Sequence, residues 1–233
     1  LSHWWENEQR GHLFGYWFGH DMFTPPFEVY PEMDEGAILF GGTDPGRFNP
    51  TYMIFCESFL PSSKKPRDPD FDRRDVYLIT QNALADGTYL DYIRAHYFRS
   101  AQQDPPFFQE MLRSTSEKEL NLTTNSLARA ARPLDQSMMR IGAYVEDKRR
   151  AKGVYPRKEI YTPSLADSDQ AYMEYMADAA VRRANNQLRP GEIVTETPDG
   201  RIAVQGQAAV MAINGLLTKV IFDKNPDHSF YIE

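Results

Sequence analysis

A strand–loop–helix pattern that occurs twice in the first half of the chain constrains its fold more than any other sequence feature. The apolar run 37–40 ends at two glycines, and a segment with apolar residues at helical spacing follows. The run 76–80, rich in β-forming residues, leads in the same way through a loop into a second such segment. Strands that alternate with helices are typical of a parallel sheet with right-handed crossovers. We therefore predict an α/β fold with a small parallel, Rossmann-like sheet flanked by helices.

The remaining sequence predicts a helical insertion and a β-hairpin added to this sheet. Residues 100–190 carry apolar side chains at helical spacing, for example Leu134, Met138, Ile141 and Val145. Two β-forming runs flank the turn sequence Pro-Asp-Gly at 198–200, so a hairpin is expected over 192–205. The run 230–232 is predicted to be a third core strand. We expect one α/β domain over residues 31–233.

Residues 1–30 form an aromatic lead-in segment that does not resemble the opening strand of a fold. Its large aromatic residues are Trp4, Trp5, Phe14, Tyr16, Trp17, Phe18, Phe23 and Phe27. They fit ordinary burial in a core, and they also fit the exit from a membrane, where Trp and Tyr favour the interface. Because the chain begins at Leu1 without Met and ends inside a predicted strand, we expect it to be cut from a longer protein at both ends.

The charge balance and the cysteine content exclude several classes of function. Lys and Arg number 26 against 33 Asp and Glu, which gives a formal net charge of −7. An acidic chain is poorly suited to nonspecific nucleic-acid binding, because that binding depends on neutralising phosphates. The single cysteine, Cys56, allows no internal disulfide, and we expect it to pack on the apolar face of the first helix. No apolar run approaches the roughly 20 residues that a membrane helix requires.

Polar residues in the loops after the two predicted strands form the candidate ligand site. Ligands of open parallel sheets bind beyond the carboxyl ends of the strands. The first loop contributes Gly42, Asp44 and Arg47, and the second contributes Asn82 and Asp86. If the strands are parallel neighbours, these residues meet at one edge, where paired carboxylates beside an arginine could bind a sugar or a cation. In the alternative interpretation, the two aspartates order their own loops as turn residues and pair with the arginine.

Motifs for cofactors, metals and nucleophilic catalysis do not occur in the sequence. The glycines of the first loop do not form G-x-G-x-x-G and there is no P-loop, so no nucleotide cofactor is predicted. His3, His12 and His20 match no zinc-ligand spacing, so no metal site is predicted. No serine lies in a G-x-S-x-G elbow. A basic cluster over 148–158 follows a predicted helix, where cations favour the helix C-terminus, although it could also meet phosphate headgroups.

Two segments resemble a bacterial protein family. The sequence GAILFGGTDPGRF at 36–48, with PTYM at 50–53, and DVYLITQNALAD at 75–86 resemble stretches of large membrane proteins. Those proteins form a domain-of-unknown-function family related to protein O-mannosyltransferases. The sequence EQRGH at 8–12 is similar to the segment after that family's hydrophobic region, and 230–233 is similar to the start of its third strand.

The resemblance implies a polytopic membrane domain of the GT-C type followed by a soluble region, to which this chain corresponds. The family's implied chemistry is transfer of a sugar from a polyprenyl-phosphate donor to a protein hydroxyl, with the catalytic residues outside this chain. We therefore expect a membrane-attached, periplasmic or otherwise extracytoplasmic accessory domain. Its expected partners are the membrane domain of the same polypeptide and a protein or glycan acceptor. The alternatives are a stand-alone periplasmic module that binds a glycan or small molecule without catalysis, and a soluble enzyme that uses Asp44 and Asp86.

Overall fold

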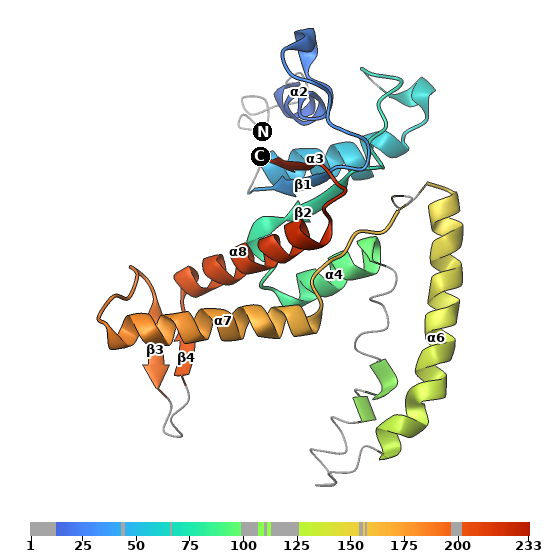
Figure 1. The fold of residues 1–233 in the computed structure, drawn as a ribbon. Helices are drawn as coiled ribbons and strands as arrows, with labels where there is room; N and C mark the ends of the chain where they lie inside the picture. The colour runs from blue at the N-terminus through green and yellow to red at the C-terminus, as the bar shows by residue number, and fades with distance from the viewer. Residues whose placement is uncertain are drawn as a thin grey trace, which may run out of the picture. The chain divides into compact units, whose positions relative to one another are not determined.

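The chain folds into two compact units, one of Leu1–Asn82 with Asp227–Glu233 and the other of Ala83–Pro226 (Figure 1). The fold is mixed α/β, with a parallel sheet of three strands in the first unit and an antiparallel pair in the second. One domain over 31–233 stays a prediction. The structure is a computed structural model, and it describes residues 13–42, 45–65, 67–98, 107–109, 111–112, 126–153, 156, 158–196 and 202–233.

The parallel sheet of the first unit consists of β1 (Ile38–Gly41), β2 (Tyr77–Thr80) and β5 (Phe230–Ile232) in the order β2-β1-β5. All four residues of β1 and of β2 are buried, which is the reason that both strands read as continuous apolar runs rather than alternating ones. The third strand is also confirmed and pairs parallel to β1. Its residues are only partly buried or exposed, so β5 is not the buried core strand that its apolar sequence predicted.

Two helices of the first unit pack against each other. The aromatic lead-in forms α2 (Phe14–Asp21), and α3 (Pro45–Phe55) follows β1. A Cβ at Gly19 would lie 2.8 Å from Cγ of Met53, so the absence of a side chain there lets the helices approach closely. Helix α3 begins at Pro45, because proline is favoured in the first turn of a helix, where its missing N–H needs no partner. Single turns of 3-10 helix also occur in the described part of the chain, over Pro26–Glu28, Glu57–Phe59, Ser62–Lys64 and Gln81–Ala83.

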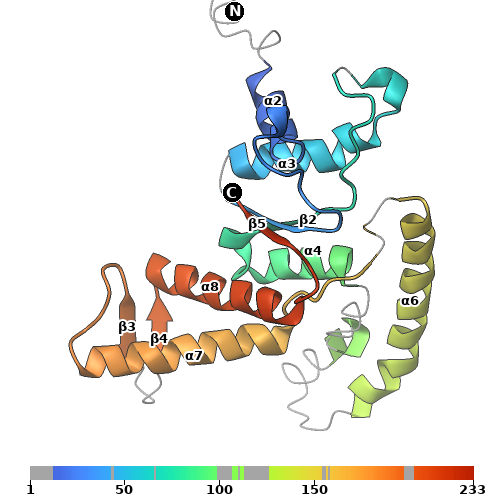
Figure 2. The same ribbon diagram turned by 45° about the horizontal axis from the view of Figure 1, so that its top comes forward.

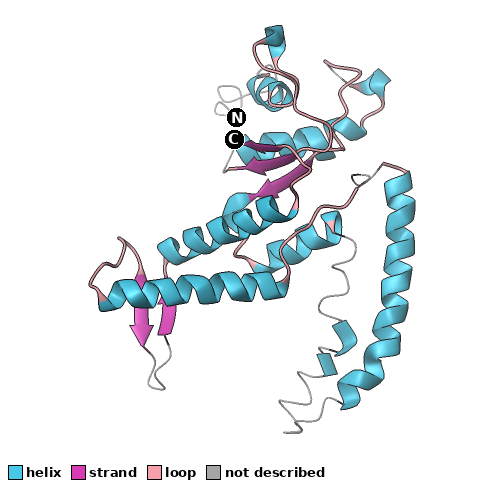
Figure 3. Ribbon diagram, viewed as in Figure 1, coloured by secondary structure: helices cyan, strands magenta, loops and turns pink. Residues whose placement is uncertain are grey.

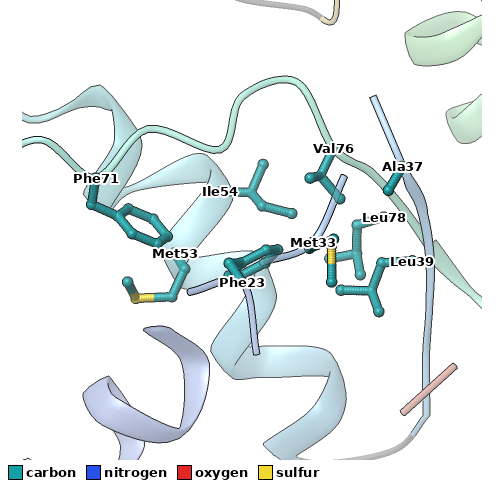
Figure 4. Packing of buried hydrophobic residues seen from close by; sticks show 9 residues of the cluster. All are labelled: Phe23, Met33, Ala37, Leu39, Met53, Ile54, Phe71, Val76 and Leu78. Carbon is teal, nitrogen blue, oxygen red and sulfur yellow. The ribbon is translucent and has the colours of Figure 1, made fainter. Parts of the chain in front are cut away.

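Large apolar side chains from the lead-in, the sheet and α3 form the core of this unit (Figure 4). They are Phe23, Met33, Ala37, Leu39, Met53, Ile54, Phe71, Val76 and Leu78. Burial in the core therefore accounts for Phe23, whereas Phe14 is 76% exposed. The prediction that Cys56 packs in the core is wrong, because Cys56 is exposed. Helix α3 ends at Phe55 and the chain turns into a 3-10 helix, so the helical spacing that placed Cys56 no longer applies.

Within the described residues, the second unit has four helices with defined bounds and the antiparallel pair (Figure 2). The elements are α4 (Gly87–Tyr97), α6 (Ser126–Ala151), α7 (Leu165–Ala184), β3 (Ile193–Glu196), β4 (Ile202–Gln205) and α8 (Gln207–Lys224). The predicted hairpin strands are thus present. Helix α7 begins with a capping box, in which Ser164 Oγ accepts the Asp167 N–H and the Asp167 carboxylate accepts the Ser164 N–H. Helices α7 and α8 lie side by side, and both contact β4.

A buried charge network joins α7 to the start of the hairpin. The Glu192 carboxylate is fully buried and accepts hydrogen bonds from the Tyr175 hydroxyl, the Arg182 guanidinium and the backbone N–H of Arg189. These donors, the arginine foremost, lower the pKa of Glu192 from 4.5 to about 2 although burial acts in the opposite direction. The carboxylate is therefore ionised at neutral pH and fixes the hairpin to α7.

Candidate functional site

The carboxyl ends of the three parallel strands lie at one edge of the sheet. Strand β1 pairs in parallel with β2, with Gly41 opposite Thr80. It also pairs in parallel with β5, with Phe40 opposite Ile232, and the Glu233 N–H extends that ladder to the Phe40 carbonyl at 3.2 Å. The prediction that the first two strands are parallel neighbours is confirmed. Their exit loops consequently start from adjacent positions on one edge.

A carboxylate that the sequence did not predict lies over the turn between β1 and α3. Oε2 of Glu233 accepts the backbone N–H of Gly42 at 3.3 Å. A Cβ at Gly46 would overlap this carboxylate, and one at Gly41 would lie 2.7 Å from the Gly46 carbonyl oxygen. Glycine is therefore needed at both positions, because the backbone at Gly41 lies close to the backbone at Gly46, and the backbone at Gly46 lies close to the Glu233 carboxylate. Only the pairing of β5 with β1 brings Glu233 here, so no local pattern in the sequence could have indicated it.

Two further predicted site residues flank the same edge. Arg47 lies in the first turn of α3 and is exposed, with its guanidinium carbon 5.7 Å from the ring centroid of Phe48. Asn82 is exposed in the 3-10 helix that follows β2 directly. Asp44 lies outside the described residues, so its pairing with Arg47 stays a prediction. Gly42, Arg47 and Asn82 thus follow strands that end at this edge, and Glu233 contacts Gly42 there.

Asp86 belongs to the second unit and has a local role there. Its Oδ1 accepts the backbone N–H groups of Thr88 at 2.8 Å and Tyr89 at 3.3 Å, which makes it the N-cap of α4. Such a cap satisfies two of the backbone donors that every helix N-terminus leaves without an intrahelical partner. This is the loop-ordering role of the alternative interpretation. A role for Asp86 in ligand binding stays a prediction.

A second polar cluster, centred on His20, was missed by the sequence reasoning. The His20 ring is largely buried, with Nδ1 3.0 Å from Oδ1 of Asp21 and Nε2 3.1 Å from Oδ2 of Asp68. Burial raises the pKa of Asp68, but the bonds from His20 and from backbone N–H groups outweigh it and hold that pKa below its ordinary value. The residues come from segments almost fifty positions apart, so spacing could not reveal them.

Glu57 is a buried carboxylate in the same unit. Its residue is 0% exposed, and Oε2 accepts the Tyr52 hydroxyl at 3.3 Å. Within the described residues, Oε1 of Glu57 and the Tyr16 hydroxyl have no hydrogen-bond partner. Burial first, and then the charge of Glu57, raise the pKa values of Tyr16 and Tyr52. Both tyrosines therefore stay protonated at neutral pH; Glu57 is buried, whereas Tyr52 is 46% exposed.

Neither a metal-binding cluster nor a membrane-spanning helix occurs among the described residues. No group of three His, Cys, Asp or Glu in this part of the chain is arranged to hold a metal ion, while His3 and His12 lie outside it. Likewise, none of the helices over these residues combines the length and the apolar character needed to cross a bilayer.

Comparisons with known proteins add no relative. No protein-family model, curated protein or solved structure matches the chain. The resemblance to the O-mannosyltransferase-related family therefore rests on the sequence segments quoted above, and it stays a prediction.

Proposed function

We propose that this chain is the accessory region of a membrane-embedded, glycosyltransferase-like protein and that it recognises a glycan at the carboxyl edge of its parallel sheet. One observation carries the proposal: the strands β1, β2 and β5 end together, and the Glu233 carboxylate lies over Gly42 at that edge. The glycosyltransferase context comes from the resemblance of residues 36–48 and 75–86.

The strand order supports this position for a ligand. The chain passes from β1 to β2 on one side and later returns to the other side of β1 as β5. We take this order as that of a small Rossmann-like sheet, in which the connections diverge at β1. Ligands of such sheets bind beyond the strand ends at the point of divergence. That point lies between β1 and β5, where Glu233 contacts Gly42.

The chemistry of the edge favours a neutral polyhydroxylated ligand. The Glu233 carboxylate accepts hydrogen bonds, the Arg47 guanidinium donates them, and the Asn82 amide does both. Sugar hydroxyls are donors and acceptors at once, so they match this mixture. An anionic group would be repelled by Glu233 unless it displaced that side chain. The preferred ligand class is therefore a neutral glycan, alone or on an acceptor protein.

Catalysis is assigned to no residue of this chain. In the proposed arrangement, sugar transfer takes place in the membrane domain of the same polypeptide, and this region presents the acceptor from the extracytoplasmic side. The reading frame upstream of Leu1 tests this part directly. We expect it to encode many apolar spans, and a complete frame without them would favour the stand-alone binding module instead.

Calorimetric titration with methyl α-mannoside and neutral oligosaccharides tests the glycan site. Arg47→Ala and Glu233→Gln should each weaken binding about tenfold, because each removes a hydrogen bond to a charged group. Gly46→Ala should weaken it as well, since the added methyl group displaces the Glu233 carboxylate. Gly215→Ala is the matched control, because a Cβ there meets nothing within 4 Å. Binding that all three edge variants leave unchanged would reject the edge as the site.

A further inference from the structure

Helix α6, which Figure 3 draws as one continuous cyan helix, has an exposed apolar stripe along one side. Its members recur at the helical spacing of four, three and four residues, and they are Leu134 (45% exposed), Met138 (51%), Ile141 (58%) and Val145 (41%). Among the described helices, α6 separates its apolar from its polar residues most strongly. A stripe of this kind usually faces a core. Here it leaves a row of apolar side chains in water.

The buried residues of α6 are Ala131 and two acidic residues, and they lie on another side of the helix. Asp135 is 3% exposed, and its carboxylate accepts the backbone N–H groups of Phe108 at 2.8 Å and Gln109 at 3.0 Å. Glu146 is 8% exposed on the same side, about three helical turns further along. The contacts that α6 makes in this unit thus use a side other than its apolar stripe. The stripe is left for a partner outside the described residues.

The charge of α6 is opposite to that of the chain. The helix carries six basic and three acidic residues, for a formal net charge of +3, whereas the whole chain has −7. Two of the three acidic residues are the buried Asp135 and Glu146. The exposed charges are therefore mainly positive: Arg129, Arg132, Arg140, Lys148 and Arg149, against the single acidic Asp147.

These features favour one partner over the others. A stable coiled coil with a second copy needs apolar heptads over three to four repeats, and the exposed stripe spans fewer than two. Two copies would also bring the same positive charges together. A basic helix with one apolar side is instead typical of a helix that lies in the interface of a membrane. We propose that α6 is such an interfacial helix and that it binds the surface of a bilayer containing anionic phospholipids.

The proposed orientation assigns a role to each side of the helix. The stripe would lie in the boundary between headgroups and acyl chains, with the helix axis parallel to the surface. Tyr144, 60% exposed beside the stripe, has an amphipathic ring that suits this depth. The Lys148 ammonium lies 4.5 Å from the Tyr144 ring centroid, on the side where it would reach lipid phosphates. Charge attraction and apolar burial then act together.

Co-sedimentation of the complete chain with vesicles tests this proposal. The protein should bind vesicles of phosphatidylcholine with about one third phosphatidylglycerol. Pure phosphatidylcholine vesicles should bind at least tenfold less protein. Higher salt should weaken the retention by screening. Ile141→Glu should lower the partition coefficient at least tenfold, because it places a charge in the stripe. Gln136→Glu adds the same charge at an exposed position outside the stripe and should change it less than threefold, with unchanged circular dichroism in both variants.

Three results would overturn the proposal. The first is that the wild-type chain does not bind the anionic vesicles. The second is that Ile141→Glu and Gln136→Glu weaken binding equally, which would show that charge alone is responsible. The third is a wild-type dimer in analytical ultracentrifugation that Ile141→Glu converts to a monomer, which would assign the stripe to a second copy. None of these results depends on glycan binding, which involves the first unit.

Discussion

Two apolar clusters, one in each unit, differ in the side chains that build them. The first unit has a core of large apolar side chains, including Phe23, Leu39 and Ile54, on a parallel sheet. The core between α7, α8 and the hairpin is smaller and includes the residues Ala179 and Ala209. There a buried carboxylate and its donors complete the packing. We therefore expect removal of volume to be most damaging in the first cluster, whereas the contact between α7 and the hairpin should be sensitive to charge and pH.

The largest expected effect is the loss of Phe23 from the core of the first unit. Phe23 is 0% exposed, and its ring lies 5.9 Å from that of Phe71 and 5.5 Å from the Arg73 guanidinium carbon. Phe23→Ala should lower the free energy of unfolding by about 4 kcal/mol, because it leaves a cavity. Denaturant unfolding measures this change. Phe14→Ala, in a helix of the same unit but 76% exposed, should cost less than about 0.5 kcal/mol.

Removing the charge of Glu192 should have the next largest effect. Glu192→Gln leaves the Arg182 guanidinium, which is 12% exposed, without its buried carboxylate, and we expect a cost of about 3 kcal/mol. The control is Glu196→Gln, because Glu196 is 56% exposed and 3.7 Å from Arg183. That exposed pair should contribute at most about 1 kcal/mol. Equal losses in the two variants would contradict the role given to the buried network.

The pH dependence of unfolding sharpens the same comparison. The pKa of Glu192 falls from 4.5 to about 2 on folding, so between these values the unfolded state binds more protons than the native state. The stability that Glu192 provides is therefore complete above pH 4.5 and is lost as the pH falls toward 2. Unfolding curves across this range should show a smaller pH dependence for Glu192→Gln than for the wild type. Parallel curves would mean that Glu192 is not the titrating group.

The smallest expected effect on stability is at the sheet edge. In Gly46→Ala the added methyl group overlaps the Glu233 carboxylate, but that side chain is exposed and can rotate away. Alanine also has the higher helix propensity, so the free energy of unfolding should change by less than about 1 kcal/mol. The nuclear magnetic resonance shift of the Gly42 amide should change clearly, because its hydrogen bond is lost. A large destabilisation would mean that the carboxylate is held rigidly.

Much of the fold could be predicted because the sequence patterns that indicate it are local. The continuous apolar runs that became β1 and β2 and the turn sequence between β3 and β4 each lie within a few residues. The predictions that failed depended on where a helix ends or how deeply a strand is buried. Cys56 is exposed because α3 ends one residue earlier, and β5 has an apolar sequence although its residues are only partly buried or exposed. Neither fact is visible in the spacing of apolar residues.

The candidate site was predictable only in part, for a related reason. Gly42, Arg47 and Asn82 follow strands whose parallel pairing could be inferred, and the structure gives that pairing. Glu233 and the His20 cluster were missed, because distant segments bring their partners together. Asp86 was predicted as a site residue, and its carboxylate serves as a helix cap. An aspartate before a helix fits both roles in sequence, so only three-dimensional contacts distinguish them.

The most direct test of the central claim is a nuclear magnetic resonance titration of the wild-type chain with neutral oligosaccharides. We predict saturable shifts of the backbone amides at Gly42, Arg47 and Asn82, with the hairpin amides of β3 and β4 unchanged. Saturable shifts confined to other parts of the chain, or no shifts with any neutral glycan tested, would contradict the assignment of the sheet edge as the ligand site.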